Sequence, residues 1–289
     1  MSTPSSHILR TLLPPSLFTV AYIALLAVYD GLRLAAWPSL PPLSLGPLGL
    51  SSSVLSLLLV FRTNTSYQRF DEARRLWGGL VNRCRDLVRL CLVYFTPQQA
   101  RLVPAVAKWV TALAHCARLH QRAPREATPL ALARLLSPAE LAGLAAATHR
   151  PNYCLQVLAR LVAKGCPDSS VAYRLDEDLK YLEDTIGGFE RLYRTPIPLS
   201  YTRHTSRLLL LWLVYAPAAL FSTLGLQALL AAPMLVLALF GIDEIGVELE
   251  EPMAILPLEA LCDAVQEQVE ELLAIDAGAA ALAASYGAA

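Results

Sequence analysis

The chain has 289 residues, of which 55% are hydrophobic and only 17% are charged. Soluble domains carry about a quarter charged residues, so this composition excludes an ordinary soluble domain and is typical of a membrane protein. Basic and acidic residues number 24 each, so the net charge gives no indication of a nucleic-acid partner. The six cysteines form no CxxC pair, and we expect buried thiols, with neither a disulfide framework nor a zinc site.

Three stretches contain no Asp, Glu, Lys or Arg: residues 11–29, 34–61 and 208–242. A membrane-spanning helix needs about 20 apolar residues, so the first two stretches each predict one span and the third predicts two spans joined by a turn. The four predicted spans lie near residues 11–32, 43–62, 207–227 and 229–247.

The segment between the second and third spans, residues 63–205, has 20 basic and 12 acidic residues, whereas residues 243–276 have 11 acidic residues and no basic one. Four spans place both on the same side of the membrane, which is expected to be the cytoplasmic side or its organellar equivalent. Apolar residues recur every three or four positions within 63–205, which predicts amphipathic helices. We therefore predict an all-α integral membrane protein with a single domain over 1–289, a helical extramembrane region at 63–205 and an acidic C-terminal segment at 248–276.

Local signals predict several helix boundaries. Pro14-Pro15 is expected to precede the first helix, and Thr96-Pro97 is expected to begin a helix of the extramembrane region. Residues 137–140 read Ser-Pro-Ala-Glu, the pattern of a capping box. The turn between the last two spans is expected at 226–233, and the Ala-rich tail after Asp276 is expected to be disordered.

Catalytic motifs are missing, since the sequence contains no GxGxxG, P-loop, GxSxG or HExxH. His115 and His120 are five residues apart and point to different faces of a helix, so we do not expect them to bind a metal together. The other histidines, His7, His149 and His204, are isolated in the sequence. We expect no enzyme activity, no cofactor and no metal site.

A polar segment, residues 61–77, directly follows the second predicted span. Arg62, Thr63 and Ser66 lie at its start. One interpretation is an anchor at the membrane interface, and the other is that the arginine and the hydroxyls serve a permeating anion. Both interpretations stay open from the residues alone.

A second unusual segment, residues 240–252, ends the last predicted span with five carboxylates. They can form a solvated helix end that pairs with basic residues, or they can bind ions directly. Glu244 and Glu248 are candidates for a charge network with Arg69, and either one is a candidate partner for Arg62. Carboxylates that face a pore would favour cations, so their orientation decides between the two selectivities.

Four blocks of sequence occur in order between the predicted spans, and together they cover the following residues: 12–15, 59–63 with 66–67 and 69–70, 190–202, and 245–247 with 250–252. Over residues 5–273 the chain resembles the bestrophin family, most closely its plant and algal chloroplast branch of voltage-dependent chloride channels. The resemblance implies a homopentamer of helical subunits in a lipid bilayer, with one axial pore. It also implies a thylakoid location and chloride as the permeating ion.

The resemblance further implies a narrow apolar neck lined by the second span and a second constriction. By position, Gly46, Leu50 and Val54 are the candidates for the neck, and their four-residue spacing places them on one helix face. Ser200 is the candidate for the second constriction. Arg62, Thr63 and Ser66 are the candidates along the anion path.

Family members that resemble this chain differ in the ion they pass, so a bicarbonate channel and a cation-selective channel remain alternatives. A non-conducting membrane scaffold is a further alternative from a different class. Animal bestrophins follow the proline of the last block with an acidic run that binds calcium, whereas Pro252 is followed here by Met-Ala-Ile-Leu-Pro-Leu. We therefore expect no calcium gate. No span carries a ladder of arginines, so any voltage dependence is expected to be shallow.

Overall fold

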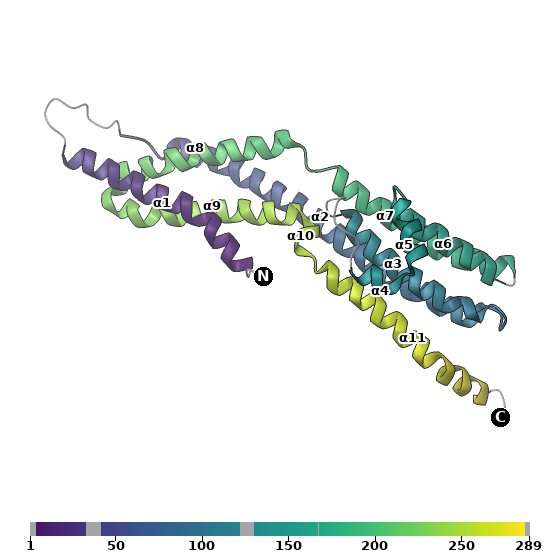
Figure 1. Cartoon of the computed structure of the whole chain (residues 1–289). Helices are drawn as coiled ribbons and strands as arrows, with labels where there is room; N and C mark the ends of the chain where they lie inside the picture. The colour runs from purple at the N-terminus through teal and green to yellow at the C-terminus, as the bar shows by residue number, and fades with distance from the viewer. Residues whose placement is uncertain (1–3, 33–41, 122–129, 167, 287–289) are drawn as a thin grey trace. The chain divides into compact units, whose positions relative to one another are not determined.

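The computed structural model describes residues 4–32, 42–121, 130–166 and 168–286. All regular elements in this part of the chain are helical, which confirms the predicted all-α class (Figure 1). The helices are α1 (Pro4–Gly31), α2 (Gly46–Tyr94), η1 (Ala100–Leu102), α3 (Val103–Gln121), α4 (Leu130–Leu135), α5 (Pro138–Ala146), α6 (Arg150–Gly165), α7 (Ser169–Arg194), α8 (Leu199–Leu224), η2 (Gly225–Gln227), α9 (Ala228–Glu250), α10 (Pro252–Ile255) and α11 (Leu258–Tyr286).

The predicted single domain comprises two compact units. Unit 1 contains residues 1–70 and 196–252, and so includes α1, the first part of α2, α8 and α9. Unit 2 contains residues 71–195 and 253–289, and so includes the rest of α2, helices α3 to α7, and α11.

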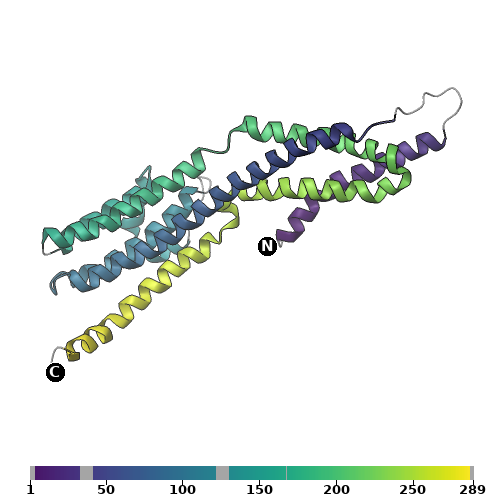
Figure 2. The same ribbon diagram turned by 180° about the vertical axis from the view of Figure 1, so that it is seen from behind.

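In the described part of the chain, three helical segments are long and apolar enough to cross a membrane, and they lie in unit 1 except for the part of α2 after residue 70. These segments are Thr11–Gly31, Gly46–Tyr94 and Leu199–Glu250. The third segment is a hairpin, because Gly225, with φ of 58°, ends α8 and a short 3-10 turn leads into α9. The left-handed φ favours glycine at this position. Helices α8 and α9 therefore lie side by side, as Figures 1 and 2 show.

Apolar side chains pack the helices of unit 1 against one another. Leu55 and Leu59 of α2 are buried in a cluster with Leu209 and Trp212 of α8. A second cluster joins α1 to the hairpin, and its buried members are Ile23, Ala228 and Ala232. The opposite surfaces of these helices keep many large apolar side chains exposed, as expected for contact with lipid or with other subunits.

Three predicted boundaries are wrong. Helix α1 includes Pro14 and Pro15 instead of starting after them, and it bends along its length in Figure 1, because each proline removes a helical N–H donor. Thr96-Pro97 starts no helix, since the Thr96 carbonyl accepts hydrogen bonds from Gln99 and Ala100 in a turn before η1. The hairpin turn lies at Gly225–Gln227, and Pro233 lies inside α9.

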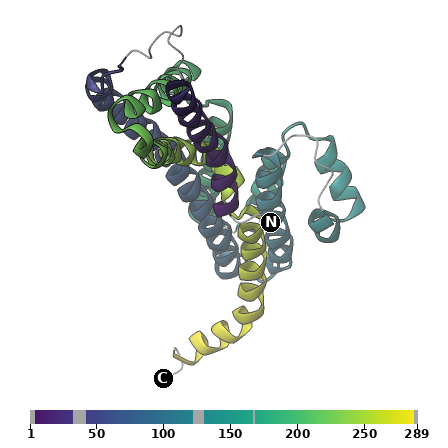
Figure 3. The same ribbon diagram turned by 90° about the vertical axis from the view of Figure 1, so that its left-hand side faces the viewer.

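Unit 2 is a bundle in which α3 contacts both α6 and α11, and α6 contacts α7. Trp77 of α2 is fully buried, and its ring centroid lies 5.0 Å from that of Phe189 of α7. The predicted capping box is confirmed, because the Ser137 hydroxyl accepts the Glu140 N–H and the Glu140 carboxylate accepts the Ser137 N–H. The predicted disorder after Asp276 is wrong up to Tyr286, since α11 stays helical to that residue, as Figure 3 shows, and residues 287–289 lie outside the described part of the chain. Alanine is the strongest helix former, which favours this extension.

The cysteines are free thiols, as predicted, and five of the six are buried. The Sγ atoms of Cys116 and Cys154 lie 3.7 Å apart, a contact between thiols and not a disulfide. Burial raises the pKa of Cys262 to about 12, so this thiol stays protonated and unreactive at neutral pH.

Candidate functional site

The first turns of α2 present an apolar face that nothing covers in the single chain. Leu50 is 83% exposed and Val54 is 54% exposed, and Gly46 is exposed at the start of the helix. Leu55 and Leu59 lie on another face of α2 and are buried against α8. The helix therefore has one face that packs within the subunit and another that is available to a neighbouring subunit or to a pore.

Arg62 lies farther along α2 and is only 2% exposed. Its Nη1 atom forms an ion pair with Asp243 of α9. Gly246, about one helical turn after Asp243, lies beside the same part of α2, since a Cβ atom there would be in ordinary van der Waals contact with Thr63 Oγ1 at 3.7 Å and Arg62 Cγ at 3.8 Å. This geometry favours the interpretation of Arg62 as a link between two helices, with Asp243 as its partner and not Glu244 or Glu248.

The two candidate hydroxyls beside Arg62 differ in their surroundings. Thr63 donates a hydrogen bond to the Leu59 carbonyl oxygen at 2.9 Å, within its own helix. Ser66 is fully buried, and its Oγ atom has no hydrogen-bond partner in the described part of the chain. A buried hydroxyl without a partner has an unused capacity to donate a hydrogen bond.

The other predicted site residues of unit 1 are spread along its helices. Ser200 is exposed in the first turn of α8, and the next residue, Tyr201, donates a hydrogen bond to the Leu58 carbonyl oxygen of α2 at 2.9 Å. Arg69 donates from Nε to the backbone carbonyl oxygen of Glu250 at 3.3 Å. Arg62 and Arg69 thus join the middle of α2 to the last turns of α9.

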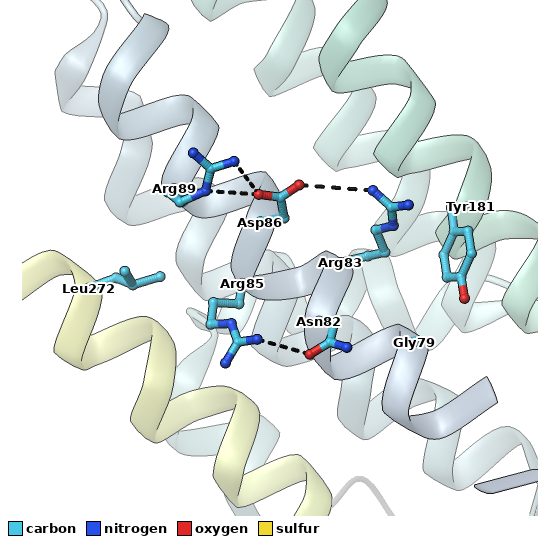
Figure 4. A pocket seen from close by; sticks show the side chains of 8 residues that line it. All are labelled: Gly79, Asn82, Arg83, Arg85, Asp86, Arg89, Tyr181 and Leu272. Atoms are coloured by element: carbon cyan, nitrogen blue, oxygen red, sulfur yellow. Dashed lines mark hydrogen bonds and ion pairs between the residues drawn. The ribbon is translucent and has the colours of Figure 1, made fainter. Parts of the chain in front are cut away.

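Unit 2 contains a pocket that the sequence did not predict, and we call it the basic pocket (Figure 4). Its volume is 520 Å³. It is lined by Gly79, Asn82, Arg83, Arg85, Asp86, Arg89, Tyr181 and Leu272. These side chains come from α2, α7 and α11, as Figure 4 shows. Tyr181 of α7 lies close to Gly79 of α2, since a Cβ atom at Gly79 would clash with the Tyr181 hydroxyl.

The arginines of the basic pocket differ in whether an acidic side chain neutralises their charge. Arg83 pairs with Asp178 at 2.7 Å and lies over the Tyr181 ring, and Arg89 donates to Asp86 at 2.9 Å. Arg85 donates to the neutral side chains of Asn82 at 2.9 Å and Gln268 at 3.3 Å, and within the described residues it has no acidic partner. The charge of Arg85 is therefore available to an anion.

Asp178 lies behind the basic pocket and has no exposed surface. Burial raises the pKa of Asp178, with Asp86 acting in the same direction, whereas the hydrogen bond from Arg83 lowers it. One oxygen of this carboxylate, Oδ2, has no partner among the described residues. Arg83 is thus held at the pocket by an acid that is itself costly to bury.

His149 is isolated in the sequence, but the fold brings it together with His120 and Glu190. Its Nε2 atom and that of His120 both contact Oε1 of Glu190, although the three residues come from different helices. The sequence spacing gave no signal for this cluster, because the residues lie 29, 41 and 70 positions apart. His115, in contrast, is buried with no hydrogen-bond partner for either ring nitrogen in the described part of the chain.

Residues 1–271 match the sequence profile of a family described as "Bacterial/Fungal Bestrophin protein". The chain belongs to the bestrophin family. It is 30% identical over 277 residues to the chloroplastic voltage-dependent chloride channel 1 of Arabidopsis thaliana, covering 94% of this chain and 67% of that protein. It is 33% identical over 237 residues to a voltage-dependent anion channel-forming protein of Nostoc, covering 78% of this chain and 76% of the relative.

The fold of this bestrophin is also that of a solved relative. A crystal structure of a bacterial bestrophin homologue from Klebsiella pneumoniae matches with a TM-score of 0.79 at 25% identity, and covers 92% of this chain and 98% of the other. The predicted family is therefore confirmed, and the relatives named here are channel-forming proteins and not enzymes.

Proposed function

We propose that this protein is an anion channel of a membrane, assembled as a homopentamer in which α2 of each subunit lines the pore and chloride is the main permeating ion. The observation that carries the proposal is the uncovered apolar face of α2, formed by Gly46, Leu50 and Val54. Five such faces around an axis form a narrow apolar neck, which controls ion flow through its wetting. The channel-forming names of the Arabidopsis and Nostoc relatives support the same function.

The selectivity for anions is proposed to come from polar and basic groups that follow the neck residues along α2. The Ser66 hydroxyl provides a donor, and the basic pocket provides the uncompensated charge of Arg85. Arg62 contributes less to the anion selectivity than its position at the end of the predicted span implies, because Asp243 neutralises its charge. Ser200, exposed at the start of α8, is proposed for the second constriction.

We propose a thylakoid location from the resemblance to the chloroplast branch of the family, and the chloroplastic names of two plant relatives support a chloroplast membrane. Two chloroplastic voltage-dependent chloride channels of Arabidopsis are 30% and 31% identical to this chain over nearly its whole length. The long apolar helices of unit 1 account for the integral membrane location. Targeting of a fluorescent fusion to isolated thylakoids tests this assignment.

Replacement of Arg85 by glutamine is expected to lower the single-channel anion conductance about twofold at low ionic strength. The change removes five positive charges from the pentamer. The electric field of these charges attracts anions and so raises their local concentration. The effect is expected to disappear near 1 M salt, where the Debye length is about 3 Å. Planar-bilayer recordings at several salt concentrations measure it.

The matched control is Arg101→Gln, which makes the same charge change at an exposed arginine outside the basic pocket. We expect this control to leave the conductance unchanged. An equal loss of conductance in both variants, or no loss in Arg85→Gln at low salt, would contradict the role of the basic pocket.

A further inference from the structure

Three helices of unit 2 bring two imidazole rings and one carboxylate to a single point. His120 is near the end of α3, His149 caps the start of α6, and Glu190 is near the end of α7. The candidate ligand atoms of the three residues all lie within 4.8 Å of one another. His120 Nε2 is 3.0 Å from Glu190 Oε1, and His149 Nε2 contacts the same oxygen. We call these three residues the histidine cluster.

We propose that the histidine cluster is a binding site for a divalent transition metal ion of the zinc class. Two imidazole nitrogens and one carboxylate oxygen are a donor set that Zn²⁺ prefers, and three protein ligands leave a fourth position for water. Bond lengths of about 2.0–2.1 Å place neighbouring ligand atoms of a tetrahedral site about 3.3 Å apart. The observed separation of 3.0 Å between His120 and Glu190 is already close to this value.

The exposure of the histidine cluster suits a site that exchanges with solvent. The side chains of His120, His149 and Glu190 are 27%, 28% and 24% exposed. A pocket of 230 Å³ adjoins the cluster and is lined by Cys116, Leu119, His120, Ala147, Thr148 and Arg150. This pocket provides space for the water that completes the coordination of the metal.

Two existing interactions compete with the metal, and both are weak. His149 Nδ1 accepts the Asn152 N–H at the start of α6, so binding through Nε2 moves the ring proton to Nδ1 and removes this cap. Loss of one exposed helix cap is small beside the binding of zinc by three ligands. Arg194 lies 4.0 Å from the other carboxylate oxygen, Glu190 Oε2, and is 68% exposed, so its charge is largely screened by solvent.

The proposal predicts that the purified full-length protein, prepared with an affinity tag that contains no histidine, binds one Zn²⁺ per subunit. Isothermal titration with zinc chloride measures the affinity, and elemental analysis after dialysis measures the stoichiometry. His120→Gln and Glu190→Gln are each expected to weaken zinc binding at least tenfold. Zinc is also expected to raise the thermal unfolding midpoint of the unaltered protein and not that of these variants, because the metal joins α3, α6 and α7.

His204→Gln is the matched control, since it removes an exposed histidine of α8 outside the cluster. If His120→Gln fails to assemble, His120→Cys replaces it, because a thiolate is also a zinc ligand and is expected to keep the affinity within about tenfold of the original. Equal zinc affinity in the unaltered protein and in His120→Gln would overturn the proposal, as would equal weakening by His204→Gln. Calcium serves as a further control and is expected not to bind, because the cluster offers it a single carboxylate.

Discussion

Replacing Arg62 by glutamine is expected to leave little assembled channel. Arg62 is 2% exposed and pairs with Asp243, so the substitution leaves a largely buried carboxylate without its partner. Breaking a buried ion pair in this way costs about 3–5 kcal/mol, which is comparable with much of the stability of a small domain. We expect a large loss of oligomer in size-exclusion chromatography and a lower thermal unfolding midpoint.

A double-mutant cycle identifies the origin of this loss. Arg62→Gln combined with Asp243→Asn removes both charges and is expected to recover more than half of the lost stability, because no unpaired charge remains. Arg203→Gln, at an exposed arginine of α8, is the control and is expected to change little. Normal assembly of Arg62→Gln together with a loss of anion preference would instead assign Arg62 to the ion path.

Replacing Leu50 by alanine is expected to raise the single-channel conductance by up to about tenfold and to change its rectification. The substitution removes apolar carbon atoms from all five subunits at the neck, which makes the constriction wider and easier to wet. A barrier lower by about 1.4 kcal/mol corresponds to a tenfold faster passage. Single-channel recording in planar bilayers measures the change.

Leu230→Ala is the matched control, because Leu230 is 72% exposed at the start of α9 and is proposed to face lipid. The control is expected to leave conductance and rectification unchanged. If Leu230→Ala altered both properties and Leu50→Ala did not, the assignment of the neck to α2 would be wrong.

Features that depend on neighbouring residues could be predicted from the sequence. Charge-free stretches and three- to four-residue periodicity are local, so they indicated the apolar helices and the all-α class. The capping box at Ser137 was also predictable, since its two partners are three residues apart. The continuation of α1 through Pro14 and Pro15 was not, because it depends on contacts of α1 with α9, which is far away in the sequence.

Contacts between distant residues account for what the sequence could not predict. Asp243, Glu244 and Glu248 lie within two turns of one helix, so only the packing of α9 on α2 selects Asp243 as the partner of Arg62. The basic pocket combines α2, α7 and α11, and the histidine cluster combines α3, the start of α6 and α7. Neither site has a sequence motif, because its residues come together through the packing of the helices. Their separations in the sequence follow no fixed pattern.

The central claim, an anion-selective pore, is tested most directly by the reversal potential of the reconstituted protein in planar bilayers under a potassium chloride gradient. We expect the reversal potential to lie near the equilibrium potential of chloride, and to follow the anion when bicarbonate replaces chloride on one side. A reversal potential near that of potassium, or no current from assembled oligomers, would contradict an anion channel.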